Sequence, residues 1–269
     1  MPPTTLEQLQ AMLERTEGAH RATPPAGKCS PVQTGTPLDR LLPPDGLPRG
    51  SLVEWLGQGP GSGATRLAFC VARAALGIAA ARDNGRVLVV IDRQRRFYAP
   101  AAARLGIDPS GLIIVRPAQQ ADELWALDQA VRCPGVAAVL WRGDKLDARH
   151  FRRLQLACQA SGVIGLLVRP PAARQEPSWA DVRLLVGPRP AARTDATLPG
   201  STARPSAGCQ STLPPWSSVR RLQVQVVRCR GRTAGTLVEL EIDDETLQIR
   251  STTALRMAAR RPARRRRPA

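Results

Sequence analysis

The sequence predicts an α/β fold in which a mostly parallel sheet is flanked by helices and followed by a C-terminal antiparallel hairpin. Three observations lead to this prediction. Apolar runs that resemble strands alternate with helical patterns through most of the chain, a glycine-rich turn joins an apolar strand to a helix, and alternation with period two appears near the end. Strands that alternate with helices are typical of parallel sheets covered by helices.

The chain begins with an amphipathic pattern. In residues 1–21, Leu6, Leu9 and Leu13 recur at helical spacing, so we expect a short N-terminal amphipathic helix there. Four prolines fall within residues 22–37, and we therefore predict a proline-rich linker for this segment.

The core is predicted to span residues 38–186. Residues 86–92 are rich in β-branched side chains, which is typical of a strand buried on both faces of a parallel sheet. Further strands are predicted at 52–56, 112–115, 136–141, 163–168 and 182–186, and helices at 65–82, 99–105, 121–132 and 148–160. Trp125 lies among leucines and valine on one of these helices, so we expect it in the core.

Three segments follow the core. Residues 187–216 contain six prolines and show no periodicity, which predicts a flexible loop. Residues 217–249 alternate with period two on both sides of a glycine-containing turn and are predicted to form a β-hairpin that completes the core. Residues 250–269 are rich in arginine and lack acids, so we expect a basic, disordered tail.

The charge of the chain points to an anionic partner. There are 39 Lys and Arg against 22 Asp and Glu, which gives a formal net charge of +17. Such a field concentrates polyanions, although the bias towards arginine also fits a GC-rich genome. We expect electrostatic, sequence-independent contacts with DNA, or contacts with an acidic protein, from Arg260, Arg261, Arg264, Arg265, Arg266 and Arg267.

No membrane association, disulfide or metal site is expected. The longest apolar stretch, residues 67–81, is interrupted by Arg73 and is shorter than the roughly 20 residues of a spanning helix. The first residues do not resemble a secretory leader, so we expect a cytoplasmic location. The six cysteines form no C-x-x-C pair and the two histidines stand alone, which favours free thiols and no bound metal.

The glycine-rich turn at residues 57–65 lies where a phosphate-binding loop is expected. That motif reads G-x-x-x-x-G-K-[ST], and its lysine reaches the phosphates. Here Ala64 takes the place of the lysine, while Gly61, Gly63 and Thr65 are the remaining candidates for a degenerate nucleotide site. Three interpretations stay open: a plain strand-to-helix turn, residual ATP binding, and hydrolysis.

Several stretches of the chain resemble the RecA family in their order and spacing. They are the entry to the glycine loop at 34–54, the strand, acidic residue and helix at 87–108, and the runs at 112–117 and 135–141. The resemblance covers residues 34–186, and the closing hairpin is similar to the late strands of RecA. It implies a RecA-like core.

Three active-site positions depart from the RecA pattern. Ala64 replaces the lysine, and Gln94 replaces the carboxylate expected two residues after Asp92. Trp141 or Arg142, depending on register, replaces the metal-side aspartate, and we expect Trp141 to fill the space of the missing metal. Since an amide cannot take a proton and each lost charge weakens catalysis, we expect no catalytic residue, no cofactor and no enzyme activity.

A RecA-like chain of this size with an eroded nucleotide site and an arginine-rich end resembles the ImuA family, whose members are also described as similar to SulA. The resemblance implies a DNA-damage-induced, non-catalytic partner of an ImuB-like Y-family protein and an error-prone DnaE-type polymerase in translesion synthesis, with RecA as a further contact. Two alternatives stay open. One is a working RecA- or KaiC-type ATPase in which Arg66 or a partner's residue replaces the lysine, and the other is a SulA-like inhibitor of cell division in the SOS response.

Overall fold

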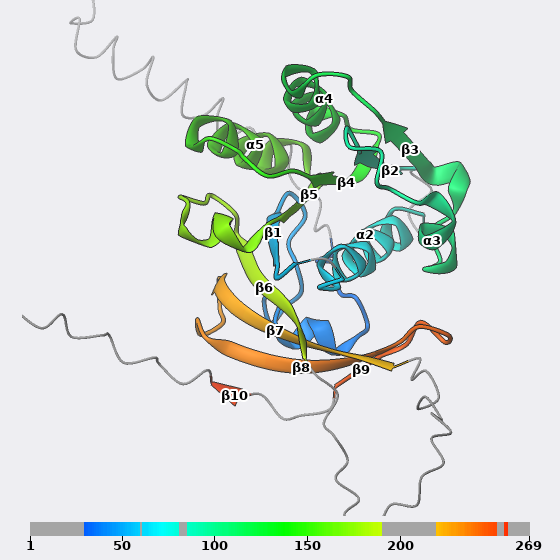
Figure 1. Cartoon of the computed structure of the whole chain (residues 1–269). Helices are drawn as coiled ribbons and strands as arrows, with labels where there is room; N and C mark the ends of the chain where they lie inside the picture. The colour runs from blue at the N-terminus through cyan, green and yellow to red at the C-terminus, as the bar shows by residue number, and fades with distance from the viewer. Residues whose placement is uncertain (1–29, 60, 81–84, 190–218, 252–255, 258–269) are drawn as a thin grey trace, which may run out of the picture.

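A computed structural model describes residues 30–59, 61–80, 85–189, 219–251 and 256–257 (Figure 1). The helix predicted at 1–21, most of the loop predicted at 187–216 and the arginines predicted to bind DNA lie outside these residues. No helix within the described ranges is long and apolar enough to cross a membrane.

The secondary structure follows the predicted alternation. The strands are β1 (Leu52–Gly57), β2 (Val87–Ile91), β3 (Leu112–Val115), β4 (Val136–Arg142), β5 (Ile164–Arg169), β6 (Val182–Arg189), β7 (Val219–Cys229), β8 (Thr236–Asp243), β9 (Ile249–Ser251) and β10 (Arg256–Met257). The helices are α2 (Ala64–Ala80), α3 (Ala99–Arg104), α4 (Gln120–Arg132) and α5 (Ala148–Ser161), with 3-10 turns η1 (Pro37–Arg40), η2 (Pro109–Gly111) and η3 (Pro171–Gln175).

One sheet joins the described strands in the order β10-β8-β7-β6-β1-β5-β4-β2-β3, with β9 also paired to β8. The strands from β6 to β3 are mutually parallel. The strands from β7 onward are antiparallel. The predicted α/β class, a mostly parallel sheet with a C-terminal antiparallel hairpin, is therefore confirmed.

Helices cover both faces of the parallel strands (Figure 1). α2 packs on one face through Leu67, Val71 and neighbouring side chains, within the larger core cluster. α4 and α5 pack on the opposite face, where Phe151 and Leu154 of α5 belong to a second cluster. Each large apolar side chain buried in this way contributes about 1.5–3 kcal/mol. The sheet is therefore the rigid frame on which the loops at its edge are mounted.

Local signals set the ends of α5. The carboxylate of Asp147 accepts a hydrogen bond from the backbone N–H of His150 at 2.9 Å, which caps the first turn. The helix ends at Gly162, whose φ of 76° is the left-handed conformation that glycine adopts readily. Together these residues fix where α5 begins and where β5 follows.

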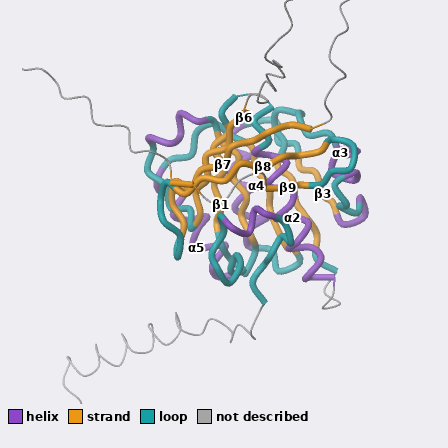
Figure 2. Tube along the Cα trace, turned by 90° about the horizontal axis from the view of Figure 1, so that it is seen from below, coloured by secondary structure: helices purple, strands orange, loops and turns teal. Residues whose placement is uncertain are grey.

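The hairpin extends the sheet beyond its parallel part. β7 pairs with β6 over the whole of that strand, and Leu222, Val224 and Val226 point their alternate side chains into the larger core cluster. In Figure 2 the strands β7 and β8 cross the near side of the molecule. β6 runs to Arg189, beyond the predicted end at 186, because β7 continues to pair with it there.

The prediction that Trp125 lies in the core is wrong. Trp125 is 66% exposed, whereas Leu127 and Val131 on the same helix are buried. Successive residues of a helix are about 100° apart, so positions 125 and 127 lie on nearly opposite sides. The inner face of α4 is set by Leu124, Leu127 and Val131, and the Trp125 ring projects outward.

Candidate functional site

The glycine-rich loop joins β1 to α2 at the edge of the sheet where the parallel strands end. Gly59, Gly61 and Gly63 have φ angles of 87°, 71° and 81°, a region that favours glycine. A Cβ added to Gly63 would lie 2.2 Å from Cδ1 of Leu222 on β7. Gly63 is therefore needed both for the turn and for close packing against the hairpin.

The first turn of α2 leaves backbone donors open. The N–H groups of Ala64, Thr65 and Arg66 have no acceptor within the described part of the chain. No acidic residue occupies this turn, so it favours an anion. Ala64 itself is 1% exposed, and its methyl group belongs to the larger core cluster. The loop thus keeps the amide donors of a phosphate site and lacks the lysine.

A cavity of about 510 Å³, which we call the loop cavity, lies beside this turn. The predicted candidates Gly61, Gly63 and Thr65 line it together with Gln94. The ends of β4 and β5 and the start of β7 add further lining residues, which include Arg142, Asp144, Arg169 and Arg220. No group of three or more His, Cys, Asp or Glu residues that could hold a metal occurs among the described residues.

The register of β4 decides which residue faces the loop cavity. Arg142 lines the cavity. Trp141 is 2% exposed and belongs to the cluster on the opposite face of the sheet, with Leu146 and Phe151. Neighbouring residues of a strand point to opposite faces, so only one of the two can reach the loop. The expectation that Trp141 fills the space of a missing metal is therefore wrong.

A second cavity of about 580 Å³, which we call the aromatic cavity, adjoins the first. The two cavities share Thr65, Arg66, Arg96, Arg142 and Arg220. Phe69 of α2 and Phe97 stack in its wall with their ring centroids 5.6 Å apart. Positive charge therefore lines the boundary between an apolar cavity and the glycine loop.

Asp244, just after β8, holds two of the shared arginines. Its carboxylate oxygens lie 2.5 Å from Arg66 Nη1 and 2.6 Å from Arg220 Nε. Burial lowers the pKa of Arg66, and the nearby Asp244 carboxylate raises it in part. Arg66 also donates to the Asp243 carbonyl at 3.0 Å. Arg66 is therefore directed to the turn after β8.

Asp92, at the end of β2, fixes the loop that carries Gln94. Its carboxylate accepts hydrogen bonds from the backbone N–H groups of Arg96 at 2.8 Å and Phe97 at 3.1 Å. Arg116 Nε lies 3.6 Å from the same carboxylate. With these contacts Asp92 acts as an anchor for the local backbone.

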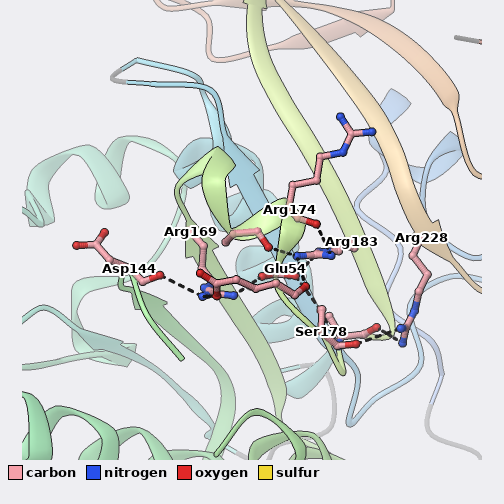
Figure 3. A network of polar contacts seen from close by, with 10 residues as sticks. Glu54, Asp144, Arg169, Arg174, Ser178, Arg183 and Arg228 are labelled. Atoms are coloured by element: carbon pink, nitrogen blue, oxygen red, sulfur yellow. Dashed lines mark hydrogen bonds and ion pairs between the residues drawn. The ribbon is translucent and has the colours of Figure 1, made fainter. Parts of the chain in front are cut away.

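A buried ion network lies next to the loop cavity (Figure 3). Glu54 of β1 is fully buried, and its two oxygens lie 2.8 Å from Arg169 Nη1 and 2.6 Å from Arg183 Nε. Ser178 Oγ donates to Glu54 at 2.8 Å, and Arg169 also pairs with Glu176. The network therefore ties β1 to the chain segment that runs from β5 through η3 to β6.

Arg169 connects this network to the loop cavity. It lines the cavity and donates to the Asp144 carbonyl at 3.1 Å, which fixes the end of β5 against the end of β4. No sequence pattern predicted this network. The available signal was that Glu54, Arg169 and Arg183 are charged residues within or at the end of apolar strands.

The remaining predicted site lies in the tail. Arg260, Arg261, Arg264, Arg265, Arg266 and Arg267 are outside the described residues, so their role in DNA contact stays a prediction.

Comparisons with known proteins agree with the geometry. No protein-family model matches the chain. The chain is 30% identical to protein ImuA of Caulobacter vibrioides (strain NA1000 / CB15N) over 202 residues. This alignment covers 74% of this chain and 78% of that protein. The chain is 33% identical over 110 residues to protein RecA of Chlorobium limicola (strain DSM 245 / NBRC 103803 / 6330), which covers 40% of this chain and 29% of that protein.

A solved structure supports the same fold. The crystal structure of the RadB recombinase aligns with a TM-score of 0.56 at 16% sequence identity, covering 82% of this chain and 100% of that chain. The fold is therefore that of the RecA and RadB proteins.

Proposed function

This chain belongs to the ImuA family, and from that premise we propose that it is a non-catalytic accessory protein of bacterial DNA-damage tolerance. It supports mutagenic translesion synthesis by binding an ImuB-like Y-family protein and an error-prone DnaE-type polymerase, with RecA as a further contact. The RecA-like frame presents surfaces to these partners, and neither nucleotide hydrolysis nor a bound cofactor is required.

Three residues around the loop cavity support the absence of hydrolysis. Ala64 puts a buried methyl group at the position of the loop lysine, and Gln94 puts an amide at the position of the general base. The position of Arg142 in the lining of the loop cavity supports the proposal most strongly. A cation at this strand end repels the metal ion that phosphoryl transfer uses. Losing one electrostatic element of this kind typically costs about 2.7–4 kcal/mol of transition-state stabilisation.

The contacts of Arg66 weigh against the ATPase alternative. In that alternative Arg66 takes over from the lysine, yet Asp244 and the Asp243 carbonyl already hold its guanidinium. Moving Arg66 towards a phosphate would break both contacts and leave Asp244 with Arg220 alone.

Co-purification tests the proposed partnership. The tagged full-length protein is expressed with the ImuB-like protein and the DnaE-type polymerase of the same genome, and the complex is isolated without nucleotide. We expect all three proteins to co-purify. Failure to form a complex, or recovery of a cell-division protein from damaged cells in place of polymerases, would refute the proposal.

A salt titration tests the proposed DNA contact. Binding of duplex DNA by the arginines of the tail should weaken by about 0.9 log unit per log unit of salt for each phosphate neutralised. Replacing Arg260, Arg261, Arg264, Arg265, Arg266 and Arg267 with serine should flatten this dependence. A slope that is the same with and without these arginines would remove the tail from the DNA-binding surface.

A further inference from the structure

The aromatic cavity lies beside the loop cavity and takes no part in the argument against hydrolysis. Its wall joins the stacked rings of Phe69 and Phe97 to Leu105, Leu140 and Leu247, which come from separate elements of the fold. A cavity of about 580 Å³ lies within the range of pockets that bind ligands. Its apolar lining favours an aliphatic or aromatic group.

The rim of this cavity carries unbalanced positive charge. Arg66 and Arg220 are paired with Asp244, and Asp92 is held by backbone N–H groups. The side chains of Arg96 and Arg142 have no hydrogen-bond or ion-pair partner among the described residues, and both residues are exposed. Two exposed guanidinium groups therefore lie at the border of the two cavities, and a guanidinium group can bind anionic oxygens in a bidentate geometry.

An exposed aromatic residue completes the rim. Tyr98 lines the aromatic cavity and is 69% exposed. Tyrosine and arginine are enriched at the energetic centres of protein–protein interfaces, where an anchor side chain fills a pocket. Exposed tyrosine, free arginines and an apolar cavity thus occur together at one place on the surface.

We propose that the aromatic cavity and the adjoining loop cavity receive an acidic peptide segment of a partner protein. An aliphatic or aromatic side chain of the peptide enters between Phe69, Phe97 and Leu105, and carboxylates next to it pair with Arg96 and Arg142. The inference rests on the proposed function, because it states which kind of segment a partner protein uses to bind this accessory protein.

Two observations favour a peptide over a nucleotide. A polyphosphate in a glycine loop is normally neutralised by the loop lysine and a divalent metal. Here Ala64 replaces the lysine, and Arg142 places a cation at the strand end where the metal-side aspartate of the RecA pattern is expected. A carboxylate needs neither, since one guanidinium group neutralises it.

Selection from a random peptide library tests the proposal. Phage-displayed 12-residue peptides are selected on the full-length protein and on the double variant Arg96→Glu/Arg142→Glu. The control variant Arg149→Glu/Arg230→Glu makes the same charge change at exposed positions that do not line either cavity. We expect the wild type and the control to enrich peptides in which several Asp or Glu flank a Leu, Phe or Trp, and the double variant to lose them.

A synthetic peptide of the selected sequence then tests the apolar half of the site. By fluorescence anisotropy, Ala101→Trp should weaken binding at least tenfold, because Ala101 is exposed and lines the aromatic cavity. Ala103→Trp, on the same short helix but outside the lining, should leave affinity within twofold.

Several results would overturn the inference. They are enrichment of no acidic consensus by the wild type, equal enrichment by the double variant, or binding of inorganic tripolyphosphate while no peptide binds. If peptides fail to bind but the full-length partners still co-purify, the cavity proposal falls and the proposed function stands. If the partners also fail to co-purify, both fall.

Discussion

Removing the charge of Glu54 should destabilise the protein strongly. The substitution Glu54→Gln keeps the size of the side chain but leaves the guanidinium groups of Arg169 and Arg183 without their shared carboxylate. The side chains of Glu54 and Arg169 are 0% exposed, and that of Arg183 is 9% exposed, so water cannot replace the lost charge.

The expected loss follows from what each arginine keeps. Breaking a buried ion pair by removing one partner costs about 3–5 kcal/mol. Arg169 retains Glu176 and the Asp144 carbonyl, and Arg183 retains backbone carbonyls of η3 and the residue after it. Because these acceptors remain, we expect a loss at the lower limit of this range. Glu54→Gln should lower the free energy of unfolding by about 3 kcal/mol.

Two further variants calibrate this value. Arg169→Met leaves Glu54 paired with Arg183 and Ser178, so the expected loss is smaller, about 1.5–3 kcal/mol. Glu241→Gln breaks only the partly exposed pair with Arg221 and should cost less than about 1 kcal/mol. Urea unfolding followed by tryptophan fluorescence gives all three values by linear extrapolation. A loss for Glu54→Gln no greater than that for Glu241→Gln would refute the reasoning.

Three other predictions concern the loop, the thiols and the acid response. Gly63→Ala should lower the free energy of unfolding, measured in urea, by at least about 2 kcal/mol, because the new methyl group clashes with Leu222 and the residue has a positive φ. Gly61→Ala also has a positive φ but its methyl group meets open space, so the loss should be about 1 kcal/mol. Burial raises the pKa of Cys158 to about 12, so at pH 8 iodoacetamide should label exposed Cys133 in the native protein and reach Cys158 only after unfolding; equal rates by mass spectrometry would contradict this. Burial alone would raise the pKa of Asp128, but hydrogen bonds from two arginines lower it overall. Its stabilising effect is therefore present above the unfolded value of 3.8 and is lost as pH falls through the lower folded value. Asp128→Asn should destabilise the protein by about 1–2 kcal/mol at pH 7, with a difference that shrinks below pH 4; a constant difference across that range would show that the carboxylate does not act through its charge.

The parallel core could be predicted from the sequence because its strands are buried on both faces. The run that forms β2 is apolar at nearly every position, a pattern that surface strands do not show. The hairpin could be predicted for the opposite reason, since β7 alternates buried and partly exposed residues along its length. The resemblance to RecA implied that Gly61, Gly63 and Gln94 belong to one site, and all three line the loop cavity.

The parts of the site that could not be predicted depend on strand register and on contacts between residues far apart in the sequence. Whether Trp141 or Arg142 faces the loop is set by how β4 registers with β2 and β5, and the sequence pattern of β4 alone is apolar on both faces. Glu54 and Arg169 are 115 residues apart, so no local sequence pattern predicts their contact. The aromatic cavity forms only because the turn after β8 comes to lie beside α2 and α3.

Magnesium-dependent ATP turnover by the full-length protein tests most directly whether this RecA-like frame acts without hydrolysis. Phosphate release is measured for the protein alone, with single-stranded and duplex DNA, and with the proposed polymerase partners. We predict release that is indistinguishable from the buffer blank under every condition, for the wild type and for Gln94→Ala alike. Turnover that rises with DNA and is abolished by Arg66→Ala would contradict the proposed role and would favour a working ATPase.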